Sequence, residues 1–66
     1  MIGNKVAEFR KEKGKSLGQV AKAVGADKSH LSKIESCKRW PGIKLMFRLA
    51  KYFNCGIEDL FFENND

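Results

Sequence analysis

The sequence predicts an all-α domain built from five short helices. Apolar side chains recur at the three- and four-residue spacing of helices, apolar and polar residues do not alternate as they would in strands, and glycines interrupt the pattern where helices would end. Sixty-six residues suffice for one domain, and a domain of that size buries only about 60% of the surface that its unfolded chain exposes. We therefore expect a single domain over 1–66 with a small core and an acidic, polar C-terminal end at 62–66.

Five segments carry the helical pattern. Their apolar positions are, in order, Ile2, Val6 and Phe9; Leu17, Val20, Ala21 and Val24; Leu31 and Ile34; Leu45, Met46, Leu49, Ala50 and Phe53; and Ile57, Leu60 and Phe61. Ser16 and Asp27 are predicted N-caps of the second and third segments, because a side-chain oxygen there can accept from free backbone N–H groups. Gly14 and Gly25 are expected to end the first two helices. A Pro41-Gly42 loop precedes the fourth helix, expected over 43–53 as the floor of the core.

The second and third segments have the spacing of a helix-turn-helix. Ala21 lies where the two helices approach each other, so a large side chain there would push them apart. Gly25 follows one helical turn later and can adopt a positive φ without strain. Leu31 and Ile34 then return to the core from the next helix. We expect this motif to run from Leu17 to Ser36.

The charge is strongly uneven along the chain. All thirteen Lys and Arg lie within 1–56, which hold only four acidic residues, whereas 57–66 hold four acidic residues and no basic ones. The formal net charge is +5 and the isoelectric point is near 9.5, in the range of nucleic-acid-binding domains. An acidic end would repel phosphate, so we expect it to face away from any nucleic acid.

Several other classes of protein find no support in the sequence. Cys37 and Cys55 are too few for a disulfide scaffold and lack the clustering of a zinc site, which favours a reducing compartment. No apolar run resembles a signal peptide or a membrane span, so we expect a cytoplasmic protein. A nucleophile with a recognisable base, a phosphate-binding loop and a metal-ligand pattern are all missing, so neither an enzyme nor a cofactor is expected. A redox role for the two cysteines is the less favoured alternative to inert packing.

Five short motifs carry a resemblance to a known family. They are Phe9-Arg10-Lys11-Glu12-Lys13-Gly14; Val20-Ala21 with Val24-Gly25; Leu31-Ser32-Lys33-Ile34-Glu35; Lys38-Arg39 with Pro41; and Ile57-Glu58-Asp59-Leu60-Phe61. On these residues, 2–61 resembles the Cro/CI (XRE) family of helix-turn-helix regulators. The resemblance implies a lambda-repressor-like bundle whose third helix lies in the major groove of double-stranded DNA.

Mapped onto this chain, the resemblance names the candidate contacts. The base-reading candidates on the third helix are Lys28, Ser29, Ser32 and Lys33. The phosphate-binding candidates are Lys15, Ser16, Ser36, Lys38, Arg39 and Lys44. His30 is interpreted as a partly covered structural residue, with a phosphate contact as the alternative. Trp40 is expected to pack over its loop rather than lie against DNA.

The sequence departs from the family at both ends of the motif. Leu17 stands where the family often has a polar residue that grips the DNA backbone, and Ser36-Cys37 replaces a common Asn-Gly. Cys37 is therefore expected to adopt a positive φ, which is uncommon for a non-glycine residue. Arg10 and Glu35 match a pair that forms a structural salt bridge in relatives.

The resulting hypothesis is a stand-alone repressor that binds a partly palindromic operator as a homodimer, without a small-molecule effector. One recognition helix reads few bases, so two half-sites about 34 Å apart are expected. The candidate dimer contact is the end Leu60-Phe61-Phe62, above all Phe61 and Phe62, together with the region between the fourth and fifth helices. Core closure explains Leu60 and is the competing explanation for Phe61. The alternative function is an antitoxin-like module that uses the same scaffold to bind a partner protein.

Overall fold

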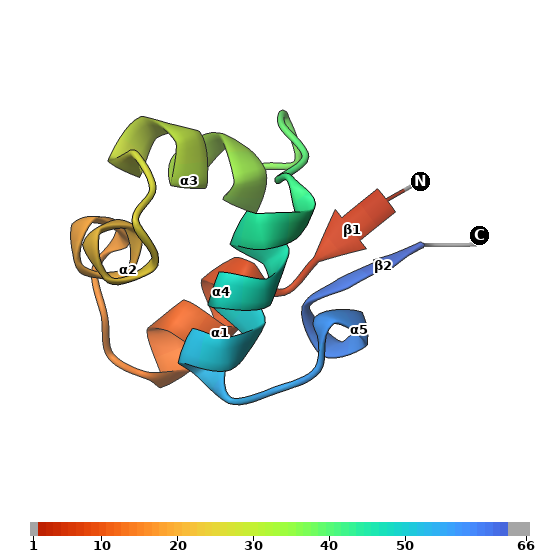
Figure 1. The fold of residues 1–66 in the computed structure, drawn as a ribbon. Helices are drawn as coiled ribbons and strands as arrows, with labels where there is room; N and C mark the ends of the chain where they lie inside the picture. The colour runs from red at the N-terminus through yellow and green to blue at the C-terminus, as the bar shows by residue number, and fades with distance from the viewer. Residues whose placement is uncertain (1, 64–66) are drawn as a thin grey trace.

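The computed structural model describes residues 2–63 of the chain, with the backbone alone at Ile2. Five helices and a small sheet follow one another in the order β1 (Ile2–Asn4), α1 (Val6–Glu12), α2 (Leu17–Val24), α3 (Lys28–Glu35), α4 (Ile43–Phe53), α5 (Ile57–Leu60) and β2 (Phe61–Glu63) (Figure 1). The predicted helical bundle is confirmed, and the range expected for the fourth helix agrees with α4 at both ends. Among the described residues, no helix is long and apolar enough to cross a membrane.

The core lies between α4 and the helices packed around it. Val6, Val20, Leu31, Ile34, Leu49 and Leu60 are completely buried, and Ala21, Val24, Ala50, Phe53 and Phe61 complete the cluster. Every helix contributes at least one of these side chains. Burial of a Leu or Ile side chain stabilises a fold by about 1.5–3 kcal/mol, so this apolar cluster is the main source of stability.

The sequence did not reveal the two-stranded antiparallel sheet. Gly3 pairs with Phe62 and Asn4 with Phe61, so the first helix begins at Val6 rather than near Ile2. Phe61 likewise belongs to β2 rather than to the last helix. Three residues are too few to show the alternation of apolar and polar residues that marks a strand. The two strands also lie at opposite ends of the described chain, so no local sequence pattern predicts their pairing.

Asn4 links this sheet to the helix-turn-helix. Its side-chain oxygen accepts from the Val6 amide at 3.1 Å, and its side-chain nitrogen donates to the Ile34 carbonyl at 2.8 Å. The first bond supports the start of α1, and the second holds β1 against the end of α3. One amide side chain therefore connects the edge of the fold to its third helix.

Candidate nucleic-acid interface

The turn between α2 and α3 has the conformation expected from the sequence. Gly25 has φ 70° and ψ 34°, in the left-handed region, and the Ala26 amide donates to the Ala21 carbonyl at 2.8 Å. Ala21 is 2% exposed, as a close approach of the helices requires. Only Gly25, Ala26 and Asp27 separate the two helices. The predicted helix-turn-helix is confirmed.

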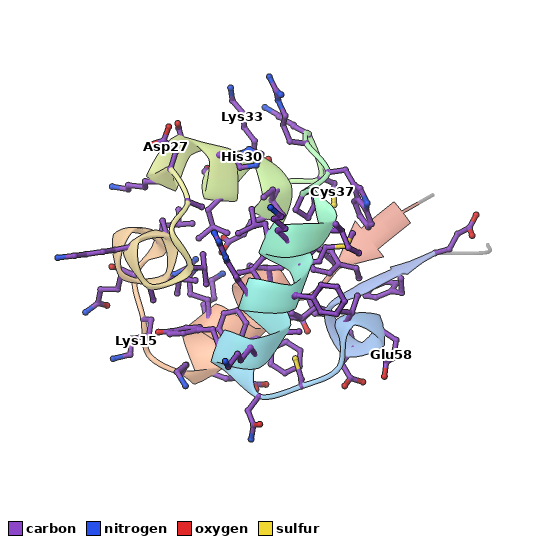
Figure 2. All side chains as sticks on the ribbon, in the orientation of Figure 1. Lys15, Asp27, His30, Lys33, Cys37 and Glu58 are labelled. Carbon is purple, nitrogen blue, oxygen red and sulfur yellow. The ribbon has the colours of Figure 1, made fainter. Side chains whose placement is uncertain are left out.

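α3 has one buried face and one free face. Leu31 and Ile34 are completely buried, whereas the four base-reading candidates Lys28, Ser29, Ser32 and Lys33 are all exposed. Their positions repeat after four residues, so they share one face of the helix. Figure 2 shows Lys33 pointing away from the body of the molecule. The structure thus brings these four candidates together on a surface that nothing in the described chain covers.

The two predicted caps have different outcomes. Ser16 caps α2 reciprocally: its hydroxyl accepts from the Gln19 amide at 3.1 Å, and the Gln19 side chain accepts from the Ser16 amide at 2.9 Å. Asp27 occupies the N-cap position of α3, but its side chain makes no capping hydrogen bond, so that part of the prediction is wrong. Its backbone carbonyl, which accepts from Leu31, begins the helix instead.

The end of α3 has the predicted unusual backbone. Cys37 has φ 63°, and the amides of Lys38 and Arg39 donate to the Lys33 carbonyl at 2.8 and 3.2 Å. The Ser36 hydroxyl donates to carbonyls of its own helix, at Ser32 or Lys33. A phosphate would need that same hydrogen, so Ser36 must release an internal bond before it can serve as a phosphate contact.

Basic phosphate-binding candidates lie at both margins of the motif. Lys38, Arg39 and Lys44 are exposed after α3, and Lys15 is half-buried before α2. Leu17, the departure from the family, is half-buried and packs against the core instead of offering a polar group to DNA. The side before α2 is therefore the less basic of the two.

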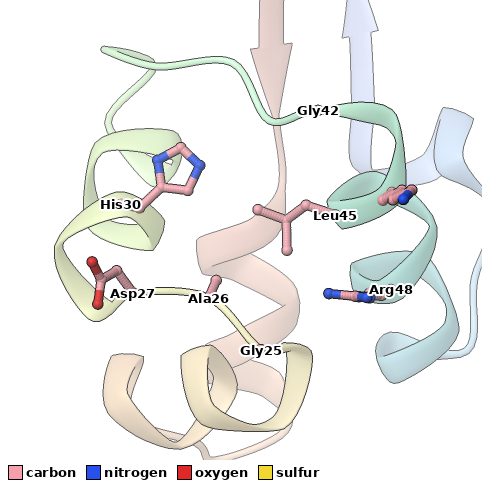
Figure 3. A pocket seen from close by; sticks show the side chains of 8 residues that line it. Gly25, Ala26, Asp27, His30, Gly42, Leu45 and Arg48 are labelled. Carbon is pink, nitrogen blue, oxygen red and sulfur yellow. The ribbon is translucent and has the colours of Figure 1, made fainter.

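An open groove between the α2–α3 turn and α4 contains a basic residue, Arg48, that was not among the candidates from the sequence. Asp27 and His30 lie on one side of it, and Arg48 comes from α4 on the other (Figure 3). Lys44, also on α4, belongs to the lining. The Arg48 guanidinium approaches Gly25, because a Cβ placed there would lie 3.5 Å from its Nη1. Arg48 stands one turn after Lys44, and that spacing was the available signal. His30 is half-buried, as the structural interpretation predicts.

Arg10 and Glu35 form the ion pair that the resemblance implies. Arg10 Nε lies 2.8 Å from Glu35 Oε2, and Arg10 Nη1 donates to the Lys15 carbonyl at 2.9 Å. Their side chains are 15% and 11% exposed. The pair therefore joins α1 to the last residue of α3 and to the segment before α2.

The aromatic residues near the C-terminal strand correct one candidate. Phe61 is only 6% exposed and meets the Trp40 ring edge-on at 5.3 Å between centroids, so core closure explains it and a dimer surface does not. Phe62 is half-buried against Gly3, whose missing Cβ makes room for its ring. Trp40 packs against Phe61 of β2 and remains 46% exposed.

These features define a DNA-binding domain of the helix-turn-helix class. A family model described as helix-turn-helix matches residues 6–60, and the chain belongs to this family, in its Cro/CI (XRE) type. The family consists of DNA-binding transcription regulators rather than enzymes.

Two kinds of comparison agree with this assignment. The HTH-type transcriptional regulator SinR of Bacillus subtilis is 33% identical over the whole chain, which spans about 60% of the length of SinR. The structure of the N-terminal DNA-binding domain of SinR matches with a TM-score of 0.76 and 31% identity, covering 82% of this chain and 80% of that domain. A Bacteroides fragilis protein at 21% identity shares the fold, with a TM-score of 0.83 over 94% of this chain and all of its own.

Proposed function

We propose that this protein is a cytoplasmic, sequence-specific repressor that binds a partly palindromic operator in double-stranded DNA as a homodimer, with α3 in the major groove. The observation that carries the proposal is the free outward face of α3. Its opposite face is fixed in the core by Leu31 and Ile34. The helix can therefore enter a groove without any rearrangement of the fold.

The residue types on that face suit the reading of bases. Lys28 and Lys33 can donate to O6 and N7 of guanine, and Ser29 and Ser32 can either donate or accept. The serines are short, so they let the helix backbone approach the base edges closely. The 31% identity with a domain described as DNA-binding supports the same role for this surface.

The surrounding charges suit a duplex on the α3 side of the molecule. Lys38, Arg39, Lys44 and Arg48 can meet phosphates beside the groove that α3 enters. Glu58, at the acidic C-terminal end, lies far from Lys33, on the opposite side of the molecule (Figure 2). The Glu58 carboxylate therefore lies on the side opposite the proposed DNA.

The homodimer follows from the size of the recognition helix. Eight residues of α3 extend over about 12 Å, which allows direct contact with only a few base pairs. Two copies related by a two-fold axis would read two half-sites about one helical turn apart, ~34 Å. A dimer bound across a promoter would obstruct RNA polymerase, which is the basis of the proposed repression.

The test is a binding titration over a range of salt concentrations. The preferred duplex is first selected from a random pool, and its affinity is then compared with that of a scrambled duplex. We expect the selected duplex to bind more tightly than the scrambled one. The logarithm of its binding constant should fall linearly with the logarithm of the salt concentration, with a slope of about −0.9 for each phosphate neutralised. Lys28→Ala should weaken binding to the selected duplex, whereas the control Lys11→Ala, at an exposed position on α1, should leave the selectivity unchanged. Equal binding of both duplexes at low salt would refute the proposal and favour the partner-protein alternative.

A further inference from the structure

The loop before α4 meets the C-terminal strand at a small hollow, which we call the Trp40 hollow. Trp40 of the loop lines it together with Phe61, Phe62 and Glu63 of β2, and its volume is about 250 Å³. At about 30 Å³ for each water molecule, that volume has room for about eight groups of this size. None of the candidate DNA contacts lines this hollow. It is therefore a separate site from the groove beside α3.

The Trp40 and Phe61 rings meet at a steep angle in this hollow. Their planes are inclined at 73° and their centroids are 5.3 Å apart. Phe61 is held in the core, whereas the Trp40 side chain stays accessible at 46% exposure. Side chains alternate between the two faces of a strand, so Glu63 lies on the same face of β2 as Phe61. An accessible aromatic ring and a carboxylate therefore share one small site.

An aromatic ring beside a carboxylate favours a positive charge. The face of an aromatic ring attracts cations, and the indole of Trp does so most strongly. Two lysines of the described chain lie over aromatic rings, but those rings belong to Phe62 and Tyr52 rather than to Trp40. The ion pair recorded within residues 2–63 does not involve Glu63. Within that part of the chain, neither Trp40 nor Glu63 has a cation of its own.

On the opposite face of β2 the chain supplies a cation itself. The Lys5 ammonium lies 6.0 Å from the centroid of the Phe62 ring, and the ring is seated against Gly3. Lys5 is held next to the strand because its amide donates to the Leu60 carbonyl at 2.8 Å. On the face that carries Trp40, no side chain of the described residues has this position, so a cation there would come from a ligand.

The lining also selects the kind of cation. A primary ammonium has three N–H donors and a guanidinium has five, and each donor that leaves water needs an acceptor. Among the side chains of the lining, only the Glu63 carboxylate can accept a hydrogen bond. A quaternary ammonium has no N–H donor and presents its charge through methyl groups, which pack well against aromatic rings. We propose that the Trp40 hollow binds a small quaternary ammonium cation.

This inference goes beyond the proposed function and does not rest on it. DNA is a polyanion and cannot supply the cation that Trp40 and Glu63 favour. The Trp40 hollow therefore needs a ligand of a different chemical class. All experiments that test it use the full chain without DNA.

The first experiment uses the fluorescence of Trp40, which is the single tryptophan of the chain. Choline chloride is titrated into the protein at constant ionic strength. We expect a saturable change in emission with a millimolar dissociation constant, because only a few weak contacts are made. Ammonium chloride and the neutral analogue of choline, in which carbon replaces nitrogen, should give no saturation. The absence of a saturable response to choline, or an equal response to the neutral analogue, would overturn the proposal.

A matched pair of variants tests the carboxylate. Glu63→Gln keeps the size of the side chain and should weaken choline binding about fivefold, because it removes one partly exposed charge pair. Glu58→Gln makes the same change in net charge at an exposed position outside the hollow, and it should leave the binding unchanged. Equal weakening by both variants would indicate a long-range effect of charge and would rule out the proposed site.

The last experiment tests the aromatic ring. Trp40→Leu keeps an apolar side chain but removes the ring, and it should weaken binding about fivefold to tenfold, measured by broadening of the choline methyl signal in nuclear magnetic resonance. Trp40→Phe keeps a smaller ring and should lose less. Circular dichroism checks that both variants are folded, and Trp40→Phe with Glu63→Gln provides the test if Trp40→Leu unfolds. Unchanged binding in a folded Trp40→Leu variant would refute recognition by the ring.

Discussion

Removal of Arg10 should destabilise the fold by more than its ion pair contributes. Arg10 donates to both oxygens of Glu35, at 2.8 and 3.3 Å, and to the Lys15 carbonyl at 2.9 Å. Arg10→Met keeps much of the apolar stem but removes all three bonds. It leaves the Glu35 carboxylate, 11% exposed, without its cation, and the Lys15 carbonyl without its donor.

The expected magnitude follows from these losses. Breaking a buried pair on one side costs about 3–5 kcal/mol, and the partial exposure of both side chains places Arg10→Met near the lower limit, about 3 kcal/mol. In Arg10→Met/Glu35→Leu no charge is left behind, and only the Lys15 carbonyl remains unsatisfied, at about 1 kcal/mol. The double variant should therefore be more stable than Arg10→Met alone.

Urea unfolding followed by far-ultraviolet circular dichroism measures these differences. In thermal unfolding, 3 kcal/mol corresponds to a loss of about 12–24 °C for a domain of this size. Lys11→Met removes a positive charge from an exposed neighbour on α1 and should change stability by less than about 0.5 kcal/mol. A cost below about 1 kcal/mol for Arg10→Met, or a double variant as unstable as the sum of its singles, would refute the reasoning.

Three further predictions concern recognition, backbone strain and pH. Lys33→Ala should relax the base preference at one operator position by about 1–3 kcal/mol, whereas Lys38→Ala should weaken binding to all duplexes alike and lower the slope of the salt dependence by about 1. Selection from a random pool measures both effects, and the reverse pattern would mean that the two side chains have exchanged roles. Cys37→Gly should stabilise the fold by about 1 kcal/mol in urea unfolding, because φ 63° strains any side chain, and an unchanged midpoint would count against strain there. Burial, with smaller effects of Asp59 and Glu58, raises the pKa of the Cys55 thiol above its ordinary value of 9.0. The folded protein therefore holds the thiol proton more tightly than the unfolded chain does. The resulting contribution to the free energy of unfolding is complete below pH 9.0 and is lost as pH rises through the folded pKa. Cys55→Ala should lessen this loss of stability at high pH, and a variant whose stability falls with pH as steeply as that of the original protein would contradict the reasoning.

The helices were predictable because pattern and boundary signals agreed. In α4 a broad apolar stripe lies between the Pro41-Gly42 loop and Asn54, whose φ of 55° ends the helix. In α2 the stripe lies between a side-chain cap at Ser16 and a left-handed Gly25. At the start of the first segment only the apolar pattern was present, without a capping residue, and the predicted start near Ile2 was wrong, because α1 begins at Val6.

The features that the sequence did not predict are those that depend on contacts between distant parts of the chain. The β1–β2 pairing joins residues about sixty positions apart, and neither strand is long enough to show a pattern of its own. Phe47 is as apolar as Phe53, and the periodic pattern alone did not show that one is 60% exposed and the other 9%. For the site, residue type and helix position located the exposed face of α3, but the hydrogen bond that engages Ser36 appears only in the folded structure.

The pairing of β1 with β2 brings the two ends of the described chain next to each other. Ile2 and Glu63 are partners in register, and both strands lie on the side of the molecule away from α2 (Figure 1). A short linker between these two positions would therefore span a small gap, and the chain could be reopened at the exposed turn around Gly14 without cutting a helix. In such a circular permutant α2 would come first, and α3 would be made before the two strands that pair across the ends of the described chain.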